Sequence, residues 1–256
     1  SEAGGLKLFL HPSGYTGKTL RGGEPGSNGL LLDRFGRLVL CQHGDRRIAR
    51  LSISLSNPRP VYETIVDKYK GKRFNSPNDA CFNKNGDLYF TDPPYGLEGL
   101  EDSPMRELDF NGIYRLSPDG ELELLVRDQS RPNGVALSPD ERTLYVANSD
   151  AENMVWMAYD IDAGGASNAR VFYDVNDQTA EGAADGMKVD AAGNIFATGP
   201  GGVWIFAPDG THLGTIMPDE VPANVGWGDD GRTLYMTART GLYRITLSTE
   251  GVMPGP

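Results

Sequence analysis

Several features that mark other protein classes are scarce or missing in this sequence, and each absence narrows what the chain can be. Only two cysteines, Cys41 and Cys81, occur among 256 residues, which excludes a disulfide framework and a thiolate metal cluster. No stretch approaches the roughly 20 consecutive apolar residues of a membrane-spanning helix, so we expect no membrane association. Basic residues are outnumbered by acidic ones, 24 against 35, which argues against a nucleic-acid partner.

The start of the chain also lacks a targeting signal. Ser1-Glu2-Ala3 is followed by neither the basic region nor the apolar region of a signal peptide. We therefore expect a cytoplasmic protein, or a periplasmic one if an N-terminal segment has been removed. The oligomeric state is left open.

What the sequence does contain is glycine and short apolar runs. Glycine accounts for 33 of 256 residues, about 13% against a typical value of about 7%. Runs of four to six apolar residues, rich in β-branched and aromatic side chains, are separated by Gly, Pro, Asn and Asp, a pattern typical of short β-strands. The clearest predicted strands are Leu38–Leu40, Leu88–Phe90, Leu144–Val146, Ile195–Ala197 and Leu234–Met236.

These five strands belong to one repeating unit. Each follows a tight polar turn and is followed, after a loop, by a second predicted strand of similar pattern. The second strands are Arg47–Leu51, Ile113–Leu116, Val155–Ala158, Val203–Phe206 and Leu242–Ile245. Units of 40 to 50 residues with four strands each predict an all-β fold built from propeller blades. A β-sandwich ranks well behind because it would lack the fixed period.

One position in the repeat is always polar. The residue that opens each innermost strand is an amide or a carboxylate, and the mean spacing is about 49 residues. The five residues are Asn28, Asn78, Asn133, Asp185 and Asn224. Because the innermost strands line the central channel of a propeller, equivalent positions should face one another around its axis.

Two interpretations of this ring are open. Asn-Gly and Asp-Gly pairs are common turn formers, which would make the ring a local backbone feature. Alternatively, the oxygen atoms bind a hard cation such as Ca²⁺, Mg²⁺ or Mn²⁺ at the mouth of the channel. We favour the cation site, because turn chemistry explains one occurrence but not why every blade keeps an amide or carboxylate there.

The loops that follow the second strand of each blade should surround this mouth. His43 and Tyr95 lie in two of these loops and are the best-placed candidates to contact a substrate. The alternative for each residue is a purely structural role, as a polar side chain whose hydrogen bonds are satisfied at the rim of a blade.

Four segments of the sequence carry a resemblance to a known family. Asn75-Ser76-Pro77-Asn78-Asp79 and Phe90-Thr91-Asp92-Pro93-Pro94-Tyr95-Gly96 resemble segments of bacterial gluconolactonases. So do Arg131-Pro132-Asn133-Gly134 and Asp185-Gly186-Met187, and the similarity runs from about Leu8 to Ile245. The family includes senescence marker protein (regucalcin), luciferin-regenerating enzyme and, more distantly, diisopropyl fluorophosphatase.

The resemblance implies a six-bladed propeller with one catalytic divalent cation in the channel. Carried over by position, Asn133 and Asp185 correspond to metal ligands, and Asn78 to a neighbouring Asn that reaches the metal or its water. Ca²⁺ is the expected ion, with Mg²⁺, Mn²⁺ or Zn²⁺ as alternatives. Asn28 and Asn224 are extrapolations from the ring alone.

The sequence departs from the family pattern in two places. The early Glu-Gly-Pro motif that supplies a further ligand is absent, and Glu24, followed by Pro25 in an inter-blade loop, is not assigned to that role. Regucalcin-type members carry an Arg where this chain has Ser76, so recognition of a sugar lactone by that Arg cannot be assumed.

The length bears on the number of blades. Six blades of about 49 residues would need about 294 residues, more than the 256 present. We expect one propeller domain over residues 1–256, six-bladed with an incomplete first blade, from which an N-terminal segment has been lost. The alternative is a five-bladed ring in which Leu6–Leu10 closes against the last blade.

These observations predict an enzyme, a lactonase of the carboxylic ester hydrolase type, that acts on a small-molecule lactone. A cation held by Asn133 and Asp185 would polarise the lactone carbonyl for attack by water. Asp185 is the candidate general base, or it holds the activated water. The alternatives are a non-enzymatic propeller that binds a structural ion and a phosphotriesterase-like hydrolase that uses the same metal.

Overall fold

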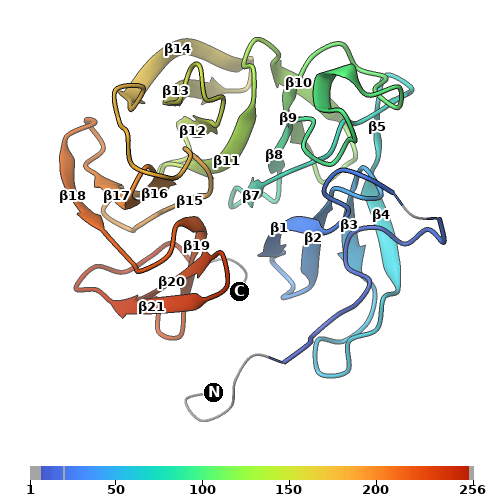
Figure 1. Ribbon diagram of the computed structural model, residues 1–256, viewed down its shortest axis with the longest axis horizontal. Coiled ribbons are helices and arrows are strands. Elements are labelled where there is room, and N and C mark those ends of the chain that lie inside the picture. The colour runs from blue at the N-terminus through green and yellow to red at the C-terminus, as the bar shows by residue number, and fades with distance from the viewer. Residues whose placement is uncertain (1–6, 20, 254–256) are drawn as a thin grey trace.

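Antiparallel strands make up nearly all the regular structure of residues 7–19 and 21–253, which are the residues described by the computed structural model. The one helical element in this part of the chain is a 3-10 turn, η1 (Leu100–Asp102). The larger sheets are arranged around a common centre, each with its first strand innermost (Figure 1). This is the propeller arrangement that the repeat predicts.

The first two blades are four-stranded. Blade 1 contains β1 (Ser27–Leu32), β2 (Leu38–Gln42), β3 (Arg47–Leu51) and β4 (Tyr62–Val66). Blade 2 contains β7 (Ala80–Phe82), β8 (Leu88–Asp92), β9 (Gly112–Leu116) and β10 (Leu122–Val126). A small hairpin of β5 (Lys68–Tyr69) and β6 (Lys72–Arg73) lies between them in the chain.

The other three blades follow the same order. Blade 3 contains β11 (Pro132–Leu137), β12 (Thr143–Asn148), β13 (Val155–Asp162) and β14 (Gly165–Asp174). Blade 4 contains β15 (Met187–Val189), β16 (Ile195–Gly199), β17 (Gly202–Phe206) and β18 (His212–Ile216). Blade 5 has three strands, β19 (Pro222–Gly228), β20 (Thr233–Ala238) and β21 (Leu242–Thr246).

The turns between the first two strands of a blade explain why each hairpin forms where it does. Gly36, Gly86 and Gly193 have φ angles of 70°, 95° and 88°, a region that glycine enters without steric cost. In blade 4, Asp190 accepts hydrogen bonds from the backbone and the side chain of Asn194, which closes the turn. The ten strands predicted from the repeat all lie within strands of the structure.

The hydrophobic core is divided among the interfaces between successive blades. One cluster around Phe74, Phe90 and Tyr114 joins blades 1 and 2, and one around Val135 and Val146 joins blades 2 and 3. The other two clusters contain the three tryptophans: Trp156 and Trp204 between blades 3 and 4, and Trp227 between blades 4 and 5.

Residues 7–19 and 21–253 therefore build five blades joined by four hydrophobic clusters. Blades 5 and 1 face each other across an open sector in Figure 1. Residues 7–10 form no strand, with Leu8 and Phe9 exposed, and Leu6 lies outside the described residues. The described part of Leu6–Leu10 thus does not supply the closing strand of a five-bladed ring, and a sixth blade is not among the described residues.

Within the described ranges, no helix has both the length and the apolar character required to cross a membrane.

Candidate functional site

The predicted ring residues occupy equivalent backbone positions at the beginning of the innermost strands. Asn78 and Asp185 precede β7 and β15 with one residue between, and Asn133 lies at the beginning of β11. The N–H of Asn78 donates to the carbonyl oxygen of Thr91, and the N–H of Asp185 donates to that of Thr198. The two threonines occupy matching places in β8 and β16, so the repeat places the two side chains in the same way.

Contacts between neighbouring blades explain the glycines that follow the ring residues. Gly29, Gly134 and Gly186 do not have the positive φ that a turn glycine would show. A Cβ atom on Gly134 would lie 2.1 Å from the carbonyl oxygen of Asp185, and one on Gly186 would lie 2.1 Å from Cγ of Asn224. Close approach of one blade to the next, rather than turn chemistry, therefore requires glycine at these positions.

Two side-chain oxygen atoms of the ring have no hydrogen-bond partner. Asn78 and Asn133 are 2% and 6% exposed, and the side-chain Oδ1 atom of each is buried without a hydrogen-bond partner. The Asn133 amide nitrogen donates to Ser149 Oγ at 3.2 Å, which leaves its oxygen free. Buried amide oxygens normally have a hydrogen-bond partner, and a bound cation would supply the missing partner of each.

Asp185 contributes the negative charge next to these amides. The carboxyl is partly buried, and burial raises its pKa to about 7, assisted by the negative charges of Asp79 and Glu24. The Asn133 side chain acts in the opposite direction and lowers this pKa. A carboxyl surrounded by other acidic groups favours a positive ion as its neighbour.

The donor set fits a hard divalent cation. It consists of two unpaired amide oxygens, from Asn78 and Asn133, and one carboxylate, from Asp185. Oxygen donors of this kind suit Ca²⁺, Mg²⁺ or Mn²⁺. Residues 7–19 and 21–253 contain no group of three or more His, Cys, Asp or Glu side chains placed to hold a metal.

The two extrapolated ring members differ from the other three. Asn28 is exposed to solvent. Asn224 lies against Gly186, but its Oδ1 atom accepts a hydrogen bond from the N–H of Val225 at 2.8 Å. Neither therefore adds an unpaired buried oxygen to the site.

Tyr95, predicted to contact substrate, lies beside the ring. Its hydroxyl forms a hydrogen bond with Ser149 Oγ, which also accepts from Asn133. Burial raises the pKa of this hydroxyl, and the nearby charge of Asp185 contributes in the same direction.

His43, the other predicted contact residue, is buried at 1% exposure in the loop after β2. A Cβ atom on Gly96 would lie 2.9 Å from Cβ of His43, so the loops that carry His43 and Tyr95 are in contact. His43 Nδ1 lies 3.4 Å from Glu24 Oε2, and its Nε2 atom is buried without a partner.

Sequence reasoning gave no site role to Glu24 or Ser149, and the structure places both near predicted site residues. The charge of Glu24 acts on Asp185, although its side chain is 63% exposed. Ser149 connects Tyr95 with Asn133. The sequence could have indicated Ser149, because it lies in one of the loops expected to frame the site. No residue next to Glu24 in the sequence indicates which residues it approaches in the fold.

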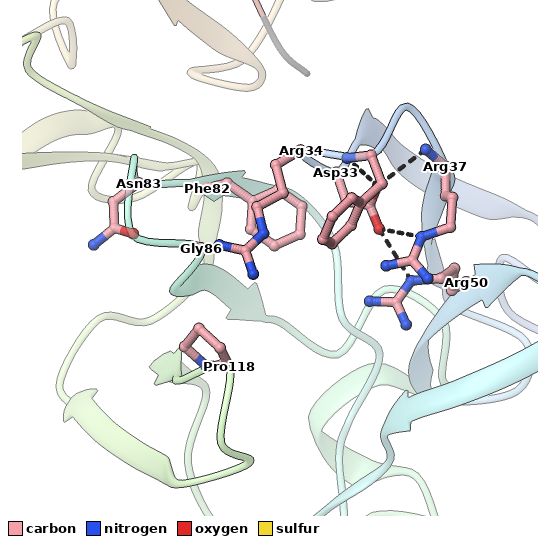
Figure 2. A pocket seen from close by; sticks show the side chains of 9 residues that line it. Asp33, Arg34, Arg37, Arg50, Phe82, Asn83, Gly86 and Pro118 are labelled. Atoms are coloured by element: carbon pink, nitrogen blue, oxygen red, sulfur yellow. Dashed lines mark hydrogen bonds and ion pairs between the residues drawn. The ribbon is translucent and has the colours of Figure 1, made fainter. Parts of the chain in front are cut away.

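A cavity of about 230 Å³ lies elsewhere, between the turns that follow β1 and β7. Arg37 and Arg50 both pair with the Asp33 carboxylate at its edge, at 2.8 Å and 3.2 Å (Figure 2). The predicted site residues do not line it. The cavity adjoins the far ends of the innermost strands and is therefore separate from the ring.

The sequence of this chain matches a protein-family profile and a gluconolactonase sequence. The profile of the SMP-30/Gluconolactonase/LRE-like region matches residues 9–240. A gluconolactonase of Zymomonas mobilis is 44% identical over 96% of this chain, which spans 71% of that relative's length.

Solved structures give the same grouping. A gluconolactonase of Xanthomonas campestris superimposes with a TM-score of 0.75 at 32% identity, covering 89% of this chain and 73% of its own. A calcium-binding protein of Agrobacterium tumefaciens, regucalcin, superimposes with a TM-score of 0.68 at 19% identity, covering 90% and 78%, which shows a shared fold.

Proposed function

Because this chain belongs to the SMP-30/gluconolactonase/LRE-like family, we propose that it is a lactonase that hydrolyses a small-molecule lactone with the help of a divalent cation. The 44% identity to a gluconolactonase over nearly the whole chain supports the reaction class. The observation that carries the cation is the pair of buried, unpaired amide oxygens of Asn78 and Asn133 beside the Asp185 carboxyl.

Asn133 and Asp185 are proposed to hold the cation, with Asn78 as their neighbour. A bound divalent cation supplies Lewis-acid polarisation of the lactone carbonyl. Ca²⁺ is the ion we propose, since neutral amide oxygens and a carboxylate are its usual ligands.

The reaction itself uses the residues at the mouth. Water attacks the carbonyl carbon, the bond between that carbon and the ring oxygen breaks, and the released alkoxide takes up a proton to give a hydroxy acid. Asp185 is the candidate to accept the proton of the attacking water as a general base, or to hold the activated water. We propose His43 and Tyr95 as the residues that contact hydroxyl groups of the substrate; the support is that His43 Nε2 has no hydrogen-bond partner and that the Tyr95 hydroxyl bonds to Ser149, a neighbour of Asn133.

Removal of metal tests the function directly. Hydrolysis of glucono-1,5-lactone, followed as acid release against an enzyme-free blank, is expected to fall to the blank rate in EDTA. Added Ca²⁺ or Mn²⁺ should restore it. Full activity in EDTA would disprove the role of the cation. No activity on any lactone, with or without ions, would indicate a binding scaffold, and activity confined to phosphotriesters would favour the phosphotriesterase-like alternative.

The raised pKa of Asp185 predicts a pH dependence of cation binding. A cation binds the ionised carboxylate, and burial keeps the pKa of this group at about 7 in the metal-free protein. Protons therefore compete with the cation below that pH, and affinity should increase about tenfold per pH unit up to pH 7 and then level off. Calorimetric titration with Ca²⁺ at several pH values measures this, and an affinity that is constant between pH 5.5 and 8.5 would contradict the assignment.

A further inference from the structure

The segment that leads into Asn78 is held on both sides by buried charged side chains. Asp92, the last residue of β8, accepts hydrogen bonds from the N–H groups of Asn75 and Ser76 at 2.8 Å and 2.7 Å. Arg46 donates through Nε to the carbonyl oxygens of Phe74 and Asn75 at 2.7 Å and 3.2 Å. One carboxylate thus holds the donors of this segment and one guanidinium holds its acceptors.

Both charged groups are placed where solvent cannot reach them. Asp92 is 0% exposed and Arg46 is 2% exposed. Burial raises the pKa of Asp92 to about 7 in spite of the two N–H groups and the Arg46 charge, which act to lower it. Burying a carboxylate is unfavourable unless its oxygens are well bonded, and each Asp92 oxygen is bonded to one backbone N–H.

The same segment is tied to the loop that carries Tyr95. Ser76 Oγ donates to the carbonyl oxygen of Pro93 at 2.6 Å and accepts from the N–H of Gly96 at 2.8 Å. Tyr95 lies between these two residues in the chain. The bonds to Asp92 therefore bear on two candidate site residues: Asn78, which follows the held segment after Pro77, and Tyr95, which lies in the loop bonded to Ser76.

We propose that Asp92 is a positioning residue, which sets the place of Asn78 and Tyr95 at the mouth of the channel without contacting substrate or cation. The proposal rests on the proposed function, because it assigns Asp92 to that same site. Mutation of a residue that orients metal ligands through hydrogen bonds, without binding the metal itself, typically lowers metal affinity or activity by about 10- to 100-fold.

Asp92→Asn is the variant that tests this, because the size is kept while one acceptor oxygen becomes an NH₂ group facing a backbone N–H. A buried aspartate with a comparable structural role offers a matched control. Asp190, also 0% exposed, accepts from the backbone and the side chain of Asn194 and from Thr249 Oγ1 in a turn at the other end of β15. Asp190→Asn should therefore disturb folding without disturbing the site.

Three quantities distinguish positioning from folding. Both variants are expected to lower the midpoint of thermal unfolding. Asp92→Asn alone should weaken Ca²⁺ binding in calorimetric titration and lower kcat/KM for the lactone, each by about 10- to 100-fold. Asp92→Asn alone should also speed hydrogen–deuterium exchange at the Asn75 and Ser76 amides.

A second variant covers the case in which Asp92→Asn does not fold. Ser76→Ala removes only the link to the Tyr95 loop, and we expect KM to increase several-fold with Ca²⁺ affinity changed less than twofold. Equal loss of Ca²⁺ affinity in Asp92→Asn and Asp190→Asn, or unchanged exchange at Asn75 and Ser76, would overturn the proposal. If the unmodified protein neither binds Ca²⁺ nor hydrolyses lactones, the proposed function fails, while the exchange measurement still reports on Asp92 by itself.

Discussion

Asp185→Asn is expected to reduce kcat/KM for lactone hydrolysis by about 10²- to 10⁴-fold, the range typical for loss of a general base, and to leave the fold intact. The amide cannot accept a proton from water, and it removes the only carboxylate from the proposed ligand set of Asn78, Asn133 and Asp185. The backbone N–H of residue 185 would still donate to Thr198, so the start of β15 is kept. Steady-state kinetics with Ca²⁺ titration measures both losses.

The same substitution five residues later provides the control. Asp190→Asn changes a carboxyl at the opposite end of β15 and should keep Ca²⁺ affinity within about twofold of the unmodified protein. Near-normal turnover in Asp185→Asn would refute the role of Asp185. A circular dichroism spectrum unlike that of the parent would instead mean that the loss is one of folding.

The second large effect, on stability and on Ca²⁺ affinity, is expected when one methyl group is added at the contact between blades 3 and 4. In Gly134→Ala the new Cβ would lie 2.1 Å from the carbonyl oxygen of Asp185 and 2.8 Å from Cα of Gly186. Both nearby atoms belong to the backbone, so the blades must separate. We expect a loss of about 1–3 kcal/mol in the free energy of unfolding, the range for overpacked sites, and at least a tenfold weaker affinity for Ca²⁺.

Gly226→Ala is the matched control for this prediction. Gly226 lies in the innermost strand of blade 5, its φ is not in the left-handed region, and a Cβ atom there would have no neighbour within 4 Å. This substitution should be neutral or slightly stabilising in denaturant unfolding. If the two variants unfold at the same denaturant concentration, the close approach does not constrain the site.

The success of sequence reasoning for the strands has a local cause. Short apolar runs such as Leu38–Gln42 and the turn glycines Gly36 and Gly86 are determined by residues near in sequence, so the repeat and its strands were predictable. The symmetry of the repeat then predicts that Asn78, Asn133 and Asp185 lie together, without any knowledge of the loops.

What sequence reasoning missed depends on contacts between distant segments. The constraint on Gly134 and Gly186 comes from the next blade and leaves no local signal, so the sequence could not show that these glycines, which lack a positive φ, are required by close approach rather than by a turn. The role of Asp92 depends on where the loop before β7 folds back onto the end of β8. Likewise, Asn28 is exposed to solvent, which the repeat pattern alone does not reveal.

Four hydrophobic clusters join five blades, so in the described part of the chain the blades stabilise one another as a linear array, in which each blade is stabilised only by contact with its neighbours. In such an array each unit is stabilised by its neighbours, so end units, with one neighbour each, open most readily. Blades 1 and 5 are the end units, whereas Asn78, Asn133 and Asp185 come from blades 2, 3 and 4, each held on both sides. Fraying at either end would therefore leave these three side chains assembled.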